Sequence, residues 1–364
     1  MRAGAPDEVL AGAPQYGCRV TSWLGSELLA SSIPVLSGRV SAKADQDVPE
    51  KLTFTVARSA AAVAGGDVVD WRPGTDARAP LARFGQQLDL TIIVSSVATA
   101  QVWETRIGRY QISDWKDDDA GRVTVTAEGM LARVRDDKLT AVTSPTSTLV
   151  AEARRLLSSG MGMSIDPALV DRVCPPGMSW SEDRLGALQE IARAWPALLR
   201  TDEWGQVRFK APLPSVPTPI LTLRDGAGGT LISAPRSDSR KDAYNTVVAT
   251  SSATDRADVV GVAQITSGPM SVNGSYGRVV KRWSSPLLDS AATAAAAAKT
   301  MLDNSTRPAQ SVPVSLAPDP RIDLDDQVAV QRGKDTVLWG FVTGYDLPLT
   351  AADGEMRIDV GVPA

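Results

Sequence analysis

GQQLDLTIIV at residues 85–94, WETRIGRYQISDW at 103–115 and RVTVTAEG at 122–129 are strand-like segments, and the polar turn KDDDAG at 116–121 precedes the last of them. Alternation of apolar and polar side chains is typical of strands with one buried face, and a polar turn between two such segments predicts an antiparallel pair. The first half of the chain therefore contains a small β-module that ends at Gly129.

The same pattern returns near the C-terminus. It consists of LDDQVAVQRG at 324–333, TVLWGFVTGYDLPL at 336–349, the turn TAADGE at 350–355 and MRIDVGV at 356–362. Each copy has a glycine, an aspartate six positions later and a turn that ends at another glycine: Gly108, Asp114 and Gly121 in the first, Gly340, Asp346 and Gly354 in the second. A chain with two similar modules can match sixfold symmetry as a trimer, because three copies present six similar faces. The repeat favours a part of an assembly over an enzyme.

The composition is that of a large globular protein. The chain has 364 residues, of which 43% are hydrophobic and 22% charged, so we expect two or three packed domains. The net charge of −4 and the pI near 5.2 provide no basic surface for specific nucleic-acid binding. The sequence shows no signal peptide, and no segment approaches the roughly 20 apolar residues of a membrane helix. We expect no membrane-spanning segment.

The chain contains no histidine. Because imidazole is the usual general base near neutral pH and the commonest metal ligand, this removes Ser/His/Asp and Cys/His arrangements and most zinc sites. We predict no catalytic, cofactor-binding or metal-binding residues. Two cysteines, Cys18 and Cys174, lie far apart. Two thiols in such a long chain are typically buried small hydrophobic residues, and the sequence leaves open whether these two form a disulfide.

The fold class is expected to be mainly β with an α+β insert. We expect a first β-barrel at 1–140, an α/β insert at 141–212 and a second β-barrel module at 213–364. The first region is mostly strand-like, with alternating runs at 38–42, 51–56 and 88–94. The stretch 60–80 has no period and predicts a surface loop.

The insert begins with a predicted helix at 146–158, where apolar residues recur at helical spacing. Thr146 or Ser147 can cap its first turn, and Gly160 lies just beyond its end. A second helix is expected from about Ser181 to Trp195.

A hairpin follows the second helix. Pro196 helps to end that helix, and strand-like segments at 198–201 and 206–210 flank the turn 202–205. These elements predict a compact α/β unit.

The third region begins after a stiff segment with four prolines, Pro212, Pro214, Pro217 and Pro219. Strands are expected at 244–249 and 278–283. An alanine-rich helix is expected at 287–304, where strong intrinsic helicity and a thin profile suit close packing against a sheet.

Two carboxylate groups are dense enough to consider as a cation site or an acid–base pair. They are Asp117, Asp118 and Asp119 in one turn, and Asp323, Asp325 and Asp326 before the second module. Neither has the glycine and distal glutamate of a calcium loop, so we expect a solvated turn for the first and a lead into the strand at Val328 for the second. The glycine-rich turn 225–230 lacks the lysine and helix of a phosphate-binding loop and predicts a flexible loop.

The chain has nine tryptophans against four phenylalanines. Five lie in strand-like segments: Trp23, Trp103, Trp115, Trp283 and Trp339. Such side chains can form sugar platforms or interface anchors, although core packing is the simpler interpretation.

The order of these segments resembles that of the tail-tip or baseplate hub proteins of tailed phages. It is carried by WETRIGRYQISDW with RVTVTAEGM, a helical insert, YNTVVA at 244–249, an alanine-rich helix, and IDLDDQVAV with WGFVTGYDLPL. The chain looks most like a minor tail protein of siphophages that infect actinobacteria. The resemblance covers most of the chain and rests on segment order and weak motifs.

This resemblance implies that both modules are tail-tube-like barrels and that a homotrimer forms a pseudo-hexameric ring at the virion tail tip. The implied partners are the tail-tube or distal tail protein ring, the tape measure protein and distal tip or fibre proteins. The resemblance implies no catalytic residues. The protein would be made in the host cytoplasm. An acidic wall would let DNA pass without binding it.

Two alternatives remain. A distal tail or adsorption protein would bind host glycan through exposed tryptophans. A carboxylate-dependent glycan hydrolase would use two Asp or Glu residues, but nothing in the sequence singles out a pair.

Overall fold

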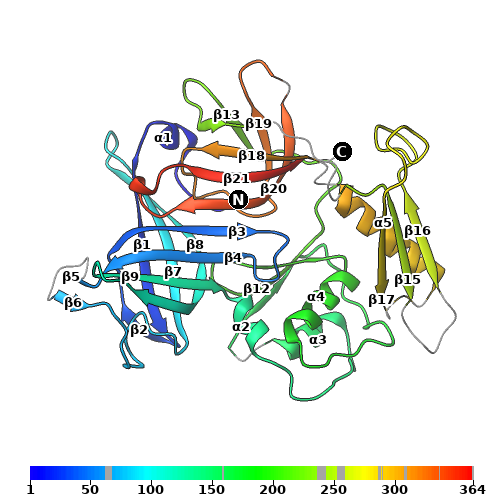
Figure 1. Cartoon of the computed structure of the whole chain (residues 1–364), viewed down its shortest axis with the longest axis horizontal. Coiled ribbons are helices and arrows are strands. Elements are labelled where there is room, and N and C mark those ends of the chain that lie inside the picture. The colour runs from blue at the N-terminus through cyan, green and yellow to red at the C-terminus, as the bar shows by residue number, and fades with distance from the viewer. Residues whose placement is uncertain are drawn as a thin grey trace.

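The chain folds into one large sheet with two smaller α/β clusters beside it (Figure 1). The computed structural model describes residues 1–61, 68–157, 160–235, 243–251, 259–285, 288, 290–306, 310–335 and 337–362. Strands dominate these residues, which confirms the predicted mainly-β fold with an α+β insert.

Among the described residues, thirteen strands form the large sheet. Its order is β14-β18-β21-β20-β3-β4-β9-β8-β7-β1-β2, and β19 pairs with both β20 and β13 beside this path. The strands are β1 (Gln15–Leu24), β2 (Glu27–Ala30), β3 (Val35–Lys43), β4 (Glu50–Ala57), β7 (Gln86–Ser96), β8 (Gln101–Asp117), β9 (Arg122–Gly129), β13 (Leu221–Arg224), β14 (Leu231–Ser233), β18 (Gln310–Leu316), β19 (Gln327–Gln331), β20 (Leu338–Pro348) and β21 (Met356–Val362).

Both copies of the predicted repeat are antiparallel meanders of three strands. β7, β8 and β9 pair in sequence order in the first copy, as do β19, β20 and β21 in the second. A β-bulge interrupts the second pairing of each copy, between Ile112 and Asp114 and between Val342 and Gly344. The repeated strand-turn-strand pattern is therefore confirmed.

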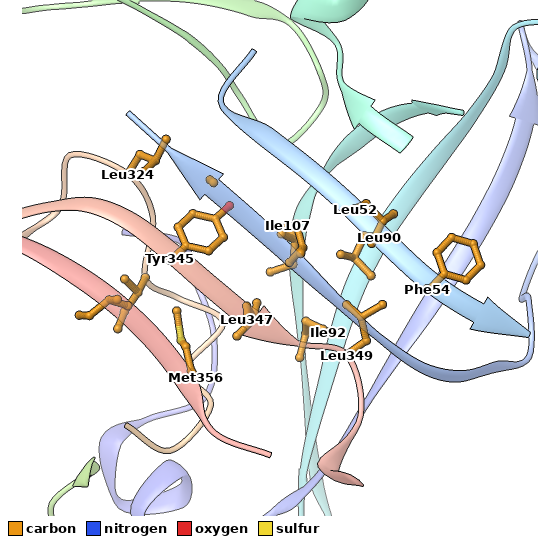
Figure 2. Close-up of a cluster of buried hydrophobic side chains, with 14 of the residues drawn as sticks. Leu52, Phe54, Leu90, Ile92, Ile107, Leu324, Tyr345, Leu347, Leu349 and Met356 are labelled. Atoms are coloured by element: carbon orange, nitrogen blue, oxygen red, sulfur yellow. The ribbon is translucent and has the colours of Figure 1, made fainter. Parts of the chain in front are cut away.

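The expectation of two barrels is corrected in one respect: the two modules share a sheet. The hairpin β3–β4 lies between the meanders, because β3 pairs with β20 and β4 pairs with β9. The sheet ends at β2 and β14, and the residues that the structure describes form no closed barrel. One hydrophobic core serves both meanders. Figure 2 shows side chains of both copies in it, among them Leu90 of β7 and Leu347 of β20.

In the described part of the chain, the insert has its own hydrophobic core, built by a small sheet of order β10-β12-β11 and three helices, of which α2 precedes the expected boundary at residue 141. The elements are α2 (Leu131–Asp136), α3 (Leu149–Leu156), β10 (Met163–Ile165), α4 (Arg184–Ala194), β11 (Leu198–Thr201) and β12 (Val207–Lys210). The two predicted helices and the hairpin are confirmed, although both helices are shorter than expected. Residues 158 and 159, at the predicted end of the first helix, lie outside the described residues.

The N-cap of α3 differs from the prediction. Thr148 caps the helix, with its hydroxyl accepting a hydrogen bond from the Ala151 backbone N–H at 3.4 Å. Thr146 instead donates its backbone N–H to the Glu152 carboxylate at 3.0 Å. Neither Thr146 nor Ser147 is the cap, because the helix begins at Leu149, three residues later than predicted.

The third cluster packs α5 (Ala291–Thr306) against a sheet of β16 (Val260–Gln264), β15 (Thr246–Ser251) and β17 (Val280–Ser285). In Figure 1 it lies at the right, beside the insert. The predicted strands and alanine-rich helix are confirmed, and Leu287, the predicted first residue of the helix, lies outside the described residues. The contact between helix and sheet is close: a Cβ at Gly261 would come within 2.1 Å of the Ala294 carbonyl carbon.

The expectation of a surface loop at 60–80 is wrong in part. Strands β5 (Ser59–Ala61) and β6 (Val68–Asp70) pair there, and residues 62–67 lie outside the described residues. The following Trp71 is 4% exposed and belongs to the main core. Burial of this large aromatic side chain stabilises the segment, although it has no regular period.

Cys18 and Cys174 are free thiols. Cys18 lies in β1 against the main core, and Cys174 belongs to the core of the insert. Burial raises the pKa of the Cys18 thiol to about 12 and that of Cys174 to about 11. Both behave as small hydrophobic residues.

Candidate functional site: a polar junction between sheet and insert

A row of neighbouring positions crosses the large sheet and carries polar side chains from both modules. Tyr345 on β20 pairs with Ala42 on β3, and Ala42 pairs with Glu50 on β4. On β9, Gly129 follows Glu128, the partner of Lys51, and pairs with Tyr110 on β8. Directly paired residues lie on the same face of a sheet. The small residues leave room for the large ones: a Cβ at Gly129 would lie 2.5 Å from Oε2 of Glu50.

Glu50 joins this row to the insert. Thr201 of β11 donates its hydroxyl to Oε1 of Glu50 at 2.9 Å. Burial, reinforced by Asp323, raises the pKa of the Glu50 carboxyl, while Thr201 and Arg200 act in the opposite direction. The contact is therefore made by a carboxyl group that is costly to ionise.

Arg2, in the N-terminal segment, binds residues next to this row. Its guanidinium donates to the Ile322 carbonyl at 2.6 Å, the Asp323 carboxylate at 2.7 Å and the Tyr345 hydroxyl at 3.1 Å. Burial alone would lower the pKa of Arg2, but Asp323 and Tyr345 more than offset this, and the pKa is raised. We call Arg2, Glu50, Tyr110, Thr201, Asp323 and Tyr345 the polar junction.

The aspartates before the second module each bind a different part of the chain. Asp325 accepts hydrogen bonds from Arg200 at 3.0 Å and from Lys210 at 3.2 Å, both on the insert hairpin. Asp326 binds the Met1 amino group at 2.5 Å. As predicted, the cluster leads into a strand, since β19 begins at Gln327. The ion pairs with distant residues were not predicted, because sequence order does not show which cations fold against these carboxylates.

The other predicted loops are turns. In the Asp117–Asp119 turn, the side chain of Asp118 accepts from the Arg122 backbone N–H at 2.8 Å, and Asp118 and Asp119 are exposed, as expected. The Asp117 side chain is only 24% exposed, because it pairs with Arg58 at 3.7 Å and with Arg72 at 3.9 Å. In the glycine-rich turn, Asp225 accepts from the Gly333 N–H at 2.8 Å. Among the described residues, no group of three or more Cys, Asp or Glu side chains could hold a metal ion.

The tip of the insert hairpin is clamped to the main sheet. Arg106 of β8 donates to the Glu203 carbonyl at 2.7 Å, and its guanidinium lies 4.1 Å from the Trp204 ring centroid. Asp89 of β7 pairs with Arg106 at 2.6 Å and with Arg109 at 2.7 Å. Burial opposes ionisation of Asp89, but the hydrogen bonds from the two arginines outweigh it and lower its pKa. These contacts hold the insert in one orientation.

The tryptophans are mainly packing residues. Trp71, Trp180 and Trp195 are buried, whereas Trp204 and Trp339 are 56% and 50% exposed. All five tryptophans expected in strands lie in strands: Trp23 in β1, Trp103 and Trp115 in β8, Trp283 in β17 and Trp339 in β20. The two exposed rings come from different elements, and Trp204 is already stacked on Arg106. This arrangement does not favour a saccharide platform.

The polar junction is suited to fixing geometry. Its cavity has a volume of about 10 Å³, which is far below the about 300 Å³ of an ordinary ligand pocket. Sequence reasoning missed Glu50, Tyr110 and Tyr345. One signal was present, because the two tyrosines occupy the middle strands of the two repeat copies. No described helix is long and apolar enough to span a bilayer.

Solved structures share this fold, although no protein-family model matches the sequence and no curated protein matches it. A tail protein from Neisseria meningitidis is 14% identical, with a TM-score of 0.62 over 95% of this chain and 96% of that one. The 43 kDa tail protein of prophage MuSo2 from Shewanella oneidensis is 13% identical, with a TM-score of 0.63 over 95% and 98%.

A type VI secretion component from E. coli, described as structurally similar to the T4 bacteriophage tail proteins gp27 and gp5, is 10% identical. Its TM-score is 0.50 over 91% of this chain and 74% of that one. At these identities the likeness is one of fold. The chain therefore has the fold of phage tail proteins.

Proposed function

We propose that this chain is a structural protein of a phage tail tip, where three copies form a hub that continues or closes the tail tube. The observation that carries the proposal is the pair of similar meanders held in one sheet by the hairpin β3–β4. Three such chains would present six similar faces, which suits a sixfold tube, and heterologous contacts would close the ring.

The polar junction supports this role through rigidity. Asp325 binds the insert hairpin from the second module, while Glu50 and Arg106 bind it from the first. The insert is therefore fixed to both modules at once. A hub needs such fixed geometry, because small rotations between modules would spoil the match to a ring of neighbours.

The proposed partners follow from the proposed position at the tail tip. One face would meet the tail-tube or distal tail protein ring, the opposite face would anchor distal tip or fibre proteins, and the tape measure protein would contact the lumen. DNA would pass without specific binding, in keeping with the net charge of −4. The assignment to minor tail proteins of siphophages of actinobacteria rests on segment order. The domain division at 1–140, 141–212 and 213–364 is likewise a proposal.

Light scattering coupled to size exclusion tests the proposal, with negative-stain images of the peak. We expect a mass of three times 38.4 kDa and a ring with a central hole and six lobes. If the isolated chain is monomeric, the same measurement is made after mixing with the tail-tube protein, where a trimer on the tube end is expected. A hexamer, or a monomer that hydrolyses glycan and ignores the tube, would contradict the hub.

A further inference from the structure

Five of the six polar-junction residues, all except Tyr345, line a small cavity that the proposed assembly role does not use. Its volume is about 10 Å³, and its walls come from the first module, the insert and the loop before β19. A cavity of about 10–15 Å³ holds one water molecule. The cavity is thus of the size of a single small polar molecule.

Two buried polar atoms border this cavity. They are Oε2 of Glu50 and the hydroxyl oxygen of Tyr110, and neither has a hydrogen-bond partner among the residues that the structure describes. Tyr110 is 1% exposed, and Glu50 is half-buried with its Oε2 atom shielded from solvent. Buried polar atoms of this kind are nearly always paired, with protein groups or with ordered water.

Two glycines keep space open beside these atoms. A Cβ at Gly129 would lie 2.5 Å from Oε2 of Glu50, and a Cβ at Gly108 would lie 3.0 Å from the Tyr110 hydroxyl. Both glycines line the cavity. Neither has a backbone conformation that requires glycine, so the absent side chain is what each contributes.

We propose that this cavity is a binding site for one water molecule, which bridges the Glu50 carboxyl and the Tyr110 hydroxyl. Tyr110 donates to the water oxygen. The water donates to Oε2 of Glu50 when the carboxyl is ionised and accepts from it when the carboxyl is protonated. The bridge extends the Thr201–Glu50 contact across Gly129 to β8, so that the insert and the middle strand of the first meander are linked through one molecule.

The surroundings favour water over a metal cation. Arg2 and Arg109 line the same cavity together with the acidic residues Asp202, Glu203 and Asp323. Asp323 is already bound to Arg2, and Asp202 accepts from the backbone N–H groups of Trp204 and Gln206. In the part of the chain that the structure describes, no group of three or more Cys, Asp or Glu side chains could hold a metal ion. A hard cation such as Ca²⁺ also needs about six to eight oxygen ligands, which a space for one molecule between two free oxygen atoms does not supply. Water needs two to four polar partners.

Removal of the Tyr110 hydroxyl distinguishes a hydroxyl that is hydrogen-bonded to water from one that has no hydrogen-bond partner. If water is bound, Tyr110→Phe removes a hydrogen bond, and the unfolding equilibrium constant in a urea titration rises about fivefold. If the hydroxyl has no partner, its removal leaves stability unchanged or increases it. Tyr16→Phe is the matched control, because the Tyr16 hydroxyl donates directly to the Pro348 carbonyl at 2.7 Å and its loss calibrates one partly buried hydrogen bond.

A high-resolution crystal structure tests the site without depending on stability. We expect a density peak about 2.6–3.2 Å from both Oε2 of Glu50 and the hydroxyl of Tyr110, and its loss in Tyr110→Phe. Gly129→Ala should also lose the peak, since the new Cβ forces Glu50 to move. A wild-type map without the peak, or a Tyr110→Phe variant as stable as the wild type, would overturn the proposal. This experiment is independent of the trimer measurement.

Discussion

Asp325 carries the charge that ties the insert to the second module. It lies in the loop before β19 with a φ of 68°, in the left-handed region, and its carboxylate binds Arg200 and Lys210. Burial opposes ionisation, but the two cations outweigh it and lower the pKa of Asp325. Its stabilising contribution is therefore complete above the ordinary pKa of aspartate and is lost as the pH falls through the folded-state pKa.

Asp325→Asn removes this charge and keeps a residue that tolerates the left-handed conformation. We expect the free energy of unfolding to fall by about 3 kcal/mol, because Arg200 and Lys210 lose their buried partner. Urea denaturation near neutral pH measures it. The control is Asp114→Asn, an exposed carboxylate 3.9 Å from Lys116, for which a change within about 0.5 kcal/mol is expected. Equal effects in both variants would show that the Asp325 contacts contribute nothing.

Glu50 gives the opposite pH dependence. Burial raises its pKa in the folded state, so its contribution is present below the ordinary pKa of glutamate and is lost as the pH rises through the raised value. Glu50→Gln keeps the shape and carries no charge. We expect the variant to gain stability relative to the wild type as the pH rises from about 4 to about 8, measured by urea titrations across this range. A difference that stays constant with pH would show that Glu50 ionises as freely as in the unfolded chain.

At the scale of elements, the packing of α5 on β16 depends on one missing side chain. A Cβ at Gly261 would lie 2.1 Å from the Ala294 carbonyl carbon and 2.3 Å from the Ala295 nitrogen, both on the helix backbone. Gly261→Ala therefore has to push the helix from the sheet. We expect a loss of about 1–3 kcal/mol by thermal or urea unfolding. Gly17→Ala in β1, where no atom lies within 4 Å of the new Cβ, is the control and should be tolerated. A stable Gly261→Ala variant would mean that the helix is loosely packed.

Periodicity predicted the elements well where local chemistry decides them. The two meanders, the insert hairpin and the alanine-rich α5 were all visible as alternation, turns or helical spacing. Trp71 was missed, because its burial depends on strands far away in sequence rather than on its own segment. Glu50 was missed for a similar reason. A glutamate at the start of a strand is usually solvated, and only the fold brings Thr201 and Tyr110 to it.

At the scale of the whole molecule, the strand pairing that joins the two modules could not be predicted from the sequence. The pairing of β3 with β20 joins segments about 300 residues apart, as in the hydrogen bond from Arg39 to Asp346, whose sequence separation is 307. Nothing local in either strand encodes the choice of partner. The paired strands β3 and β20 belong to different modules, and the main hydrophobic core takes residues from both.

This shared core predicts how the molecule opens. The main core takes residues from both meanders, whereas the third cluster has a small core, with Val247, Ala249, Leu288, Ala294, Ala298 and Leu302 as its buried hydrophobic residues in the described part of the chain. Regions with few buried contacts open first. In hydrogen exchange followed by mass spectrometry, we expect β15, β16 and β17 to exchange well before β3, β4 and β20.

The two meanders should exchange together, as one cooperative unit. Where β3 pairs with β20, Arg39 of β3 binds the Asp346 carboxylate and the carbonyls of Asp353 and Glu355. Arg39→Met should therefore speed exchange in β7–β9 and β19–β21 alike, whereas Arg357→Met, a control at a 69% exposed side chain on β21, should change little. Faster exchange confined to β19–β21 would show that the modules open separately. Such independence would also weaken the hub, because a ring of six similar faces built from three chains requires that the two faces of each chain keep a fixed relation.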